Sequence, residues 1–253
     1  MITISVIGSG NVAHHLVKII SKTSGLNLIQ IIVRTQESFT DIDFINKVCT
    51  DYNAILPADL YILAVSDDAI ADVSSRLPFI NRLVVHTSGS VDVQKLNGKN
   101  KRGVFYPLQT FSKNKPVDFT NVPLCLEAEH FDDYALLEIV ANAISKSVFS
   151  ITSKQRQAVH VCAVFVCNFV NYMYQIGNSI CDQYQIPFQI VHPLIQETAL
   201  KIESLSPINA QTGPAKREDI ETINAHLRFL SDENQKEIYK ILTKSIIDNG
   251  RKL

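Results

Sequence analysis

The sequence predicts an α/β domain with a doubly wound, mostly parallel sheet, followed by an all-α domain. Three observations favour this fold class. A strand-like run, a glycine turn and a helical segment open the chain, and apolar runs of strand length then alternate with helical segments up to residue 151. Beyond that point only helical patterns follow. The length of 253 residues suits two domains, and we predict a boundary between residues 1–151 and 152–253.

The first fourteen residues have the order that a dinucleotide-binding Rossmann domain needs. The β-branched run 2–7 leads into Gly8-Ser9-Gly10-Asn11-Val12-Ala13, and a helical segment follows. Gly8 would allow a tight turn, Gly10 would let backbone N–H groups approach a pyrophosphate, and Ala13 would permit close helix–strand packing. The helix N-terminus would face the phosphates. The alternative is a plain structural turn, since glycines also join strands to helices in sheets that bind no nucleotide.

The end of the second strand-like run, residues 28–33, favours NADP over NAD. A Rossmann domain that binds NAD usually carries Asp or Glu at this point. This chain has Arg34-Thr35, whose guanidinium and hydroxyl suit a 2′-phosphate. A solvated surface arginine is the alternative, and Glu37 is close enough to serve NAD if the loop folds differently.

Two further strand ends carry small and polar residues. The apolar run 60–65 stops at Ser66-Asp67-Asp68, and residues 83–85 lead into His86-Thr87-Ser88-Gly89-Ser90. Parallel strands bring their C-terminal ends to one edge of the sheet, so these segments should meet the glycine turn there. Further strands are expected near residues 103–108, 122–126 and 148–151, with a helix over 131–145. The predicted cofactor-binding residues are Gly8, Ser9, Gly10, Asn11, Val12, Arg34, Thr35, Ala64, Val65, Ser66, Thr87 and Ser88.

Composition limits the partners that the chain is expected to bind. A net charge of −1 argues against a nucleic acid, whose phosphates usually attract a marked basic excess. The five cysteines show no C-x-x-C or His-paired spacing, so we expect reduced thiols, no metal site and a cytoplasmic location. The first apolar run has no basic segment before it and is not typical of a signal peptide.

Residues 157–181 contain no Lys, Arg, Asp or Glu, which predicts one long helix. Its length could span a membrane, but its polar side chains would be costly in lipid, so we predict a buried helix of a soluble protein. On a regular α-helical wheel the polar residues share one stripe, which indicates a wet cleft or a subunit interface. Within that stripe His160 is the candidate general acid, with a structural histidine as the alternative. The stripe consists of Gln157, His160, Asn168, Asn171, Gln175 and Asn178.

The remaining segments are also helical in pattern. Helices are predicted over residues 188–205, from the loop 209–219 through Leu230, and from a capping box at Asp232 to about Asp248.

Several strings together resemble a family of two-domain Rossmann proteins whose C-terminal half is the domain of unknown function 2520. The most specific string runs from Thr212 to Ile223 and is followed by His226. The others are residues 6–13, His86-Thr87-Ser88-Gly89-Ser90, Tyr106-Pro107-Leu108-Gln109-Thr110-Phe111 and residues 160–168.

This family is similar to the deazaflavin-dependent NADP oxidoreductases and to the 6-phosphogluconate and pyrroline-5-carboxylate reductase group. The resemblance implies an N-terminal NADP domain, a helical C-terminal domain that forms a homodimer, and a cleft for a small-molecule substrate between them. The hydroxyacid dehydrogenases of that group carry a catalytic Lys on the long helix and an Asn four residues later. Here His160 is followed by Val164, and Asn168 comes a further turn on, so their mechanism cannot be transferred.

We therefore predict an oxidoreductase that uses NADP(H) on a small carbonyl or imine compound. His160 would be the proton donor, Asn168 an orienting donor, and Arg217 an anchor for a substrate carboxylate or cofactor phosphate. One alternative is an NADP(H) sensor without chemistry, which the missing Lys favours. A methyl-donor enzyme is less consistent with the sequence, because Arg34 replaces the acidic residue that usually contacts its adenosine.

Overall fold

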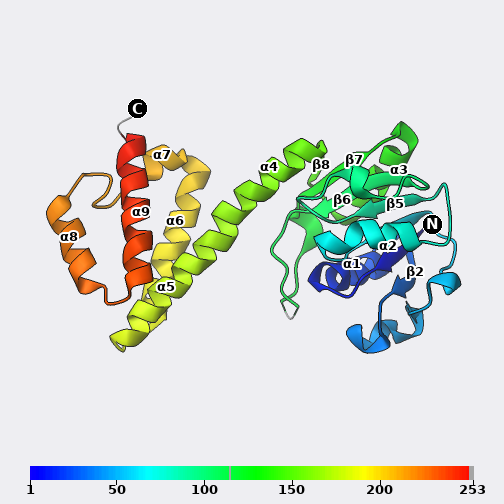
Figure 1. Cartoon of the computed structure of the whole chain (residues 1–253), viewed down its shortest axis with the longest axis horizontal. Helices are drawn as coiled ribbons and strands as arrows, with labels where there is room; N and C mark the ends of the chain where they lie inside the picture. The colour runs from blue at the N-terminus through cyan, green and yellow to red at the C-terminus, as the bar shows by residue number, and fades with distance from the viewer. Residues whose placement is uncertain (114, 251–253) are drawn as a thin grey trace. The chain divides into compact units, whose positions relative to one another are not determined.

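The computed structural model describes residues 1–113 and 115–250, which fall into two compact units, Met1–Asn168 and Phe169–Leu253 (Figure 1). The first unit holds the sheet, and the second is helical. The first helix after the sheet, α4 (Ser153–Ala163), belongs to the first unit. The functional division between residues 151 and 152 stays a prediction.

One sheet in the described part of the chain has the order β3-β2-β1-β4-β5-β6-β7-β8. Every neighbouring pair is parallel except β6 and β7, so the predicted mostly parallel, doubly wound sheet is confirmed. The strands are β1 (Ile2–Ile7), β2 (Leu26–Ile32), β3 (Val48–Cys49), β4 (Leu60–Leu63), β5 (Leu83–His86), β6 (Lys101–Pro107), β7 (Leu124–Ala128) and β8 (Val148–Ser150).

Strand β4 shows why these runs are apolar throughout. Leu60 and Ile62 join one hydrophobic cluster with α1 (Asn11–Lys22) and α3 (Phe131–Ile144). Tyr61 and Leu63 point to the opposite face and join a second cluster with α2 (Ile70–Arg76). Because successive side chains alternate between faces, a strand that is covered on both sides needs apolar residues at every position.

Short 3₁₀ turns connect several of these elements. The segment after the second strand forms η2 (Ile42–Lys47), and the short strand β3 after it was not predicted. Two other turns bear on the candidate site, namely η3 (Tyr52–Ala54) and η4 (Asp67–Ala69).

The second unit is helical, as predicted. A π-helical segment, η7 (Val164–Phe169), joins α4 to α5 (Val170–Gln183). The other elements are η8 (Phe188–Val191), α6 (His192–Ser204), α7 (Pro207–Ala210), α8 (Ile220–Phe229) and α9 (Glu233–Gly250).

The π segment corrects the prediction of one regular α-helix over residues 157–181. A π turn is wider than an α turn, so each residue in it rotates less about the helix axis. Asn168 lies within this segment, and Asn171 follows it. The single polar stripe drawn on a regular wheel is therefore wrong beyond Ala163.

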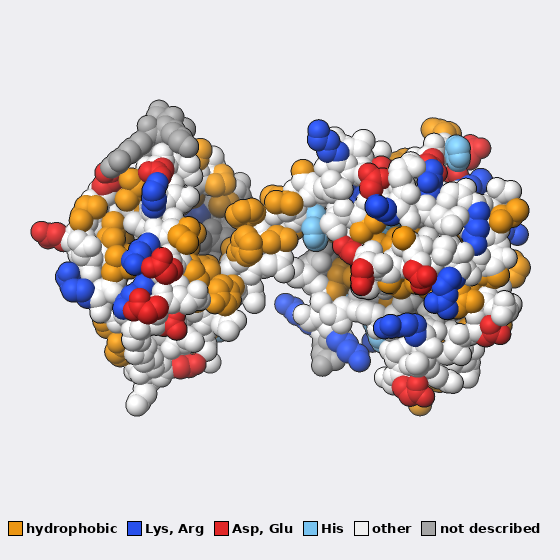
Figure 2. All heavy atoms as spheres, in the orientation of Figure 1, with side chains coloured by type: hydrophobic (Ala, Val, Ile, Leu, Met, Phe, Trp, Pro, Cys, Tyr) orange, Lys and Arg blue, Asp and Glu red, His pale blue; other side chains and the backbone are white. Residues whose placement is uncertain are grey.

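The prediction that this helix is buried is also wrong for the single chain. The side chains of Val161, Phe165, Val166 and Phe169 are between 50% and 62% exposed, and Figure 2 shows hydrophobic side chains along α4 and α5. By length and composition Ser153–Gln183 is the one helical run, among the described residues, that could cross a membrane. One such helix is weak support for a membrane span, and its amide side chains would be costly in lipid.

Candidate functional site

The turn after β1 depends on a glycine at position 8. Gly8 has a φ of +130°, and a Cβ atom there would lie 2.1 Å from the carbonyl oxygen of Ala64. The parallel register of β1 and β4 causes this close approach, because Ile7 pairs with Leu63 and the next residues of the two strands lie side by side. Any side chain at position 8 would therefore separate the two strand ends.

The second glycine of the turn leaves open space at the N-terminus of α1. A Cβ atom at Gly10 would have no neighbour within 4 Å. Gly10 is also the N-cap residue of α1, without a side-chain hydrogen bond, and the first turn holds no acidic residue. The free N–H groups and the helix dipole at this end favour an anion such as a pyrophosphate.

A pocket of about 470 Å³ lies over this turn and brings together residues from the ends of three strands, β1, β2 and β4, from the turns η3 and η4, and from α2. It contains seven of the predicted cofactor-binding residues, namely Gly8, Ser9, Gly10, Arg34, Ala64, Val65 and Ser66. The other lining residues, which the sequence reasoning missed, are Ile7, Ile32, Val33, Tyr52, Ala69, Asp72, Val73 and Arg76. The open cradle at Gly10 and the exposed guanidinium of Arg34 fit the phosphates of a dinucleotide.

Asn11, Val12 and Thr35 do not line this pocket. The side-chain amide of Asn11 donates to the carbonyl of Phe111 at 3.0 Å, and the His15 ring bonds the carbonyl of Ser112 through Nε2 at 3.1 Å. Two successive turns of α1 thus hold the segment that follows β6. The proposed contacts of Asn11, Val12 and Thr35 with a cofactor stay predictions.

Thr87 and Ser88 are buried at the end of β5. The Ser88 hydroxyl accepts hydrogen bonds from the backbone N–H groups of Ser90 and Val91, at 3.1 and 3.0 Å. The side chain of Ser88 therefore holds its own turn, and a contact with a nicotinamide stays a prediction.

Three segments that are distant in the sequence meet at His160. The Tyr106 hydroxyl, at the end of β6, lies 3.1 Å from Nδ1 of His160 in α4. A Cβ atom at Gly89 would lie 2.5 Å from the same Nδ1 atom and 2.8 Å from Cζ of Tyr106, so a side chain at this position would have to displace these rings. Burial raises the pKa of Tyr106 to about 12, and the phenol keeps its proton at neutral pH. When the phenol donates to Nδ1, a neutral imidazole carries its proton on Nε2.

The start of α4 is attached firmly to the sheet. Arg156, one helical turn before His160, is fully buried and forms an ion pair with Glu127 of β7. The backbone N–H of Ser153 donates to the same carboxylate at 2.9 Å, and the Gln157 amide donates to the carbonyl of Ser90 at 3.0 Å. These contacts fix the position of His160 relative to β5 and β7.

His86 is fully buried close to this group, and its Nδ1 accepts a hydrogen bond from the backbone N–H of Ser88 at 3.1 Å. Burial, together with the positive charge of Arg156, lowers the pKa of His86 to about 4. His86 is therefore neutral near pH 7 and cannot serve there as a cationic acid.

The other two predicted catalytic residues are not brought to His160 by any contact that the structure shows. Asn168 is exposed in η7. Arg217 belongs to the second unit, in a turn where its N–H donates to the carbonyl of Pro214 at 3.2 Å before α8. Their roles stay predictions.

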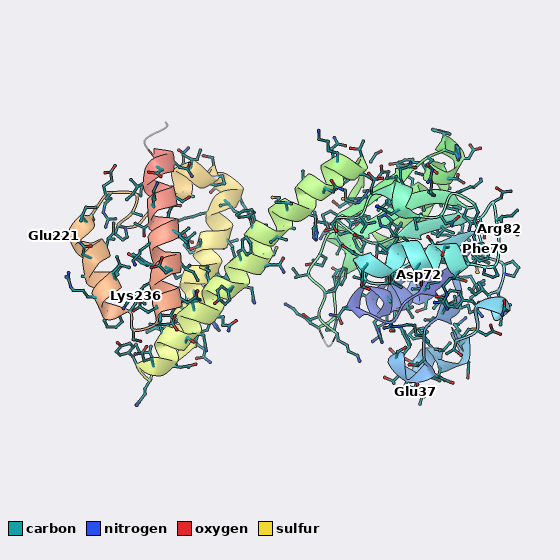
Figure 3. The ribbon with its side chains drawn as sticks, viewed as in Figure 1. Glu37, Asp72, Phe79, Arg82, Glu221 and Lys236 are labelled. Atoms are coloured by element: carbon teal, nitrogen blue, oxygen red, sulfur yellow. The ribbon has the colours of Figure 1, made fainter. Side chains whose placement is uncertain are left out.

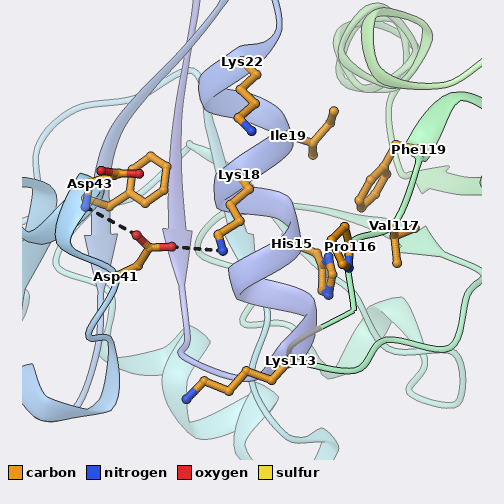
Figure 4. A pocket seen from close by; sticks show the side chains of 11 residues that line it. His15, Lys18, Ile19, Lys22, Asp41, Asp43, Lys113, Pro116, Val117 and Phe119 are labelled. Carbon is orange, nitrogen blue, oxygen red and sulfur yellow. Dashed lines mark hydrogen bonds and ion pairs between the residues drawn. The ribbon is translucent and has the colours of Figure 1, made fainter.

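A larger cavity, of about 590 Å³, lies along α1 beyond its first turn (Figure 4). Its basic residues are Lys18, Lys22, Lys113 and His15, and Lys18 pairs with Asp41 at 3.1 Å. It contains none of the predicted site residues, so we place the candidate site at the glycine turn. In residues 1–113 and 115–250, no group of three or more His, Cys, Asp or Glu side chains could hold a metal ion.

Comparison with known proteins gives one family and several related structures. The model of the domain of unknown function 2520 matches residues 122–246. A provisionally named NADP oxidoreductase from Bacteroides fragilis is 38% identical, with a TM-score of 0.90 over 98% of both chains. No curated protein matches the chain.

Two more distant structures share the fold. A 1-pyrroline-5-carboxylate reductase from Streptococcus pyogenes is 15% identical, with a TM-score of 0.62, and covers 100% of this chain and 99% of its own. An imine reductase from Myxococcus stipitatus, in complex with NADP+, is 13% identical, with a TM-score of 0.64 over 99% of this chain and 93% of its own. The similarity to the Bacteroides protein along nearly the whole length, together with the domain match, shows that the chain belongs to the family that carries the domain of unknown function 2520.

Proposed function

We propose that the chain is an NADP-dependent oxidoreductase that acts on a small carbonyl or imine compound. The observation that carries the proposal is the open cradle at Gly10, which adjoins the uncapped N-terminus of α1 and shares a pocket with Arg34. The name of the Bacteroides relative, an NADP oxidoreductase, supports the same cofactor.

NADP(H), when bound, would supply the hydride chemistry. The residues of this chain would bind and orient it. The N–H groups of Ser9 and Gly10 and the first turn of α1 would hold the pyrophosphate, and Arg34 would contact the 2′-phosphate. Ala64, Val65 and Ser66 would border the ligand at the end of β4, where Ser66 donates to Asp68 and lowers the pKa of that carboxyl.

His160 would give a proton to the oxygen or nitrogen atom on which charge develops. Tyr106 would direct the imidazole so that its Nε2–H is the donating group. Because Arg156 and Gln157 attach α4 to the sheet, the imidazole would be held in place with little reorganisation. Asn168 would orient the substrate, and Arg217 would bind a carboxylate or phosphate.

The comparisons support a substrate with a C=N bond more than one with a C=O bond. Two proteins that share the fold are named for reactions of imines, the imine reductase and the 1-pyrroline-5-carboxylate reductase.

We also propose that the second unit forms a homodimer interface in a cytoplasmic protein, with neither a membrane nor a nucleic acid as a partner. Among the described residues after Asn168, only Ala215 and Ile223 are buried hydrophobic residues. Large side chains such as Ile190, Leu194 and Ile241 are more than 60% exposed. A unit of this size needs more apolar burial than this, and a second copy would provide it.

The test combines cofactor binding with turnover. We expect calorimetry to show NADPH binding at least about tenfold tighter than NADH. His160→Ala should then lower turnover by about 10² to 10⁴ while NADPH affinity stays the same. No heat with either cofactor would refute the proposal, and unchanged turnover would refute the role of His160.

The second candidate is a sensor that binds NADP(H) without chemistry. It is favoured by the absence of the catalytic Lys that the related hydroxyacid dehydrogenases carry on their long helix, with an Asn four residues later. In this chain His160 is followed at that spacing by Val164. Tight NADPH binding, combined with no hydride transfer to a broad panel of carbonyl and imine compounds, would support the sensor.

A further inference from the structure

We propose that Arg76 is a second 2′-phosphate ligand, which determines the cofactor preference together with Arg34 and is held in position by Tyr52. This inference rests on the proposed function. It concerns residues from three separate segments, the loop after β2, the turn η3 and the helix α2, and all of them line one pocket.

One face of the segment η4–α2 is directed at the pocket. Ala69, Asp72, Val73 and Arg76 all line it, and their spacing of i, i+3, i+4 and i+7 is that of one helical face. Figure 3 labels Asp72 on α2. Arg76 is the last residue of this helix, so its long side chain extends from the end of that face.

Tyr52 and both arginines line the same pocket, and Tyr52 contacts Arg76 directly. The Arg76 guanidinium lies over the Tyr52 ring, with Cζ 4.8 Å from the ring centroid. Burial raises the pKa of the Tyr52 phenol, and the charge of Asp72 raises it too, whereas the positive charges of Arg76 and Arg34 lower it. A neutral tyrosine therefore supports Arg76 by stacking while its own proton stays on the phenol.

The charges of the pocket suit a dianion. Its charged lining residues are Arg34, Arg76 and Asp72, so the lining carries a net positive charge. Asp72 lies 3.6 Å from Arg76, and because both side chains are more than half exposed, this ion pair is weak and costs little to break. Both arginines are exposed in this lining, and a phosphate that contacts both would offset the repulsion between their positive charges.

An opposite reading assigns Asp72 to the ribose 2′-hydroxyl, as acidic residues do in NAD-binding domains. Under that reading Arg76 only partners Asp72, and its removal would not weaken binding of a 2′-phosphate. The two readings therefore differ in their effect on ligands that carry or lack this phosphate.

The experiment uses the full-length protein and the adenosine half of the cofactor alone. Calorimetry would measure 2′,5′-ADP and 5′-AMP binding to the wild type, to Arg76→Gln and to Arg34→Gln. Arg82→Gln is the matched control, since Arg82 is an exposed arginine outside the pocket lining (Figure 3). Thermal unfolding would confirm that each variant is folded.

We expect Arg76→Gln to weaken 2′,5′-ADP binding by about 10- to 100-fold, the effect of losing a hydrogen bond between charged groups, and to change 5′-AMP binding less than about twofold. Tyr52→Leu should reproduce part of this loss, whereas Tyr52→Phe should not, because the aromatic ring is kept. The control should behave as the wild type.

The role of Arg76 would be overturned if Arg76→Gln weakened the binding of both ligands equally. It would also be overturned if the wild type bound 2′,5′-ADP well and the variant bound it equally well. Either result would leave the proposed function intact. A wild type that binds neither 2′,5′-ADP nor NADPH would overturn both.

Discussion

The Tyr106 hydroxyl and Nδ1 of His160 lie 3.1 Å apart, although 54 positions separate the two residues in the sequence. Their rings meet edge to face at 70°, and no side chain at position 89 comes between them. This contact joins the end of β6 to the helix that leaves the sheet, and it gives the imidazole one defined hydrogen-bond partner. Four of the predictions below depend on the geometry of the sheet unit, and the fifth concerns the exposed helices.

Tyr106→Phe should lower kcat by about 5- to 30-fold, because it removes one hydrogen bond of about 1–2 kcal/mol that orients His160, the proposed proton donor. NADPH affinity should stay unchanged, since Tyr106 does not line the cofactor pocket. Steady-state kinetics and calorimetry would measure both. Tyr134→Phe, on α3, is the control, and equal kcat values for the two variants would contradict the role of Tyr106.

Gly89→Ala should displace the His160 ring, because the new Cβ atom would lie 2.5 Å from its Nδ1. A misplacement of about 1 Å can cost about 10² in rate, and we expect a loss of that size in kcat. Gly98→Ala serves as the control, since its Cβ atom would meet only ordinary contacts, the nearest at 3.8 Å. Wild-type turnover in Gly89→Ala would show that the ring is free to move.

Arg34→Glu should narrow or invert the preference for NADPH over NADH. The substitution places a carboxylate where a 2′-phosphate would bind, and the same carboxylate can accept a hydrogen bond from the ribose of NAD. Dissociation constants for both cofactors measure the effect. An unchanged ratio would mean that Arg34 is only a solvated surface residue.

His86 predicts a specific loss of stability in mild acid. Its pKa of about 4 in the folded protein lies below the ordinary value of 6.5. Between pH 4 and pH 6.5 the unfolded chain therefore binds more protons than the folded protein. The contribution of neutral His86 to the free energy of unfolding is fully present above about pH 6.5 and is lost as the pH falls towards 4. It amounts to about 2 kcal/mol between pH 7 and pH 5. Urea unfolding of the wild type at these two pH values should show the loss.

In the same experiment His86→Gln should remove most of this pH dependence, although the variant is less stable at pH 7 because the site is buried. His130→Gln, at an exposed position, should retain the pH dependence of the wild type. If His86→Gln retained it too, another group would be responsible.

Leu194→Asp should convert a homodimer into a monomer. Leu194, in α6 of the second unit, is 66% exposed in the single chain, and a carboxylate in an apolar interface would be costly to bury. Light scattering after size-exclusion chromatography measures the mass. Ile42→Asp is the control, because it alters a more exposed residue of the sheet unit and should leave the measured mass unchanged. A wild type that is monomeric would refute the dimer.

The alternating pattern of the first unit could be predicted from sequence because burial on both faces leaves a simple record. The run 60–65 is apolar at every position because β4 is covered on both sides of the sheet. The glycine turn was equally informative, since Gly8 and Gly10 serve two separate needs, close strand packing and open space.

Other parts of the site were harder to predict from the sequence. Tyr52 and Arg76 line the pocket only because η3 and α2 fold back towards Arg34, although the spacing of Ala69, Asp72, Val73 and Arg76 could have indicated the helical face. The π segment was missed because the wheel assumed a constant rotation per residue. The exposure of the long helix was missed because an apolar composition does not distinguish the core of one chain from a surface that another molecule would cover.

The contact between Gly8 and the Ala64 carbonyl has a consequence for how this family can diversify. Where main chain touches main chain, there is no side chain that mutation could exchange for another. Changes in cofactor preference within such a fold must therefore come from the periphery, through the loop after β2 and the exposed face of α2, while the base of the site stays the same in every member that keeps this turn.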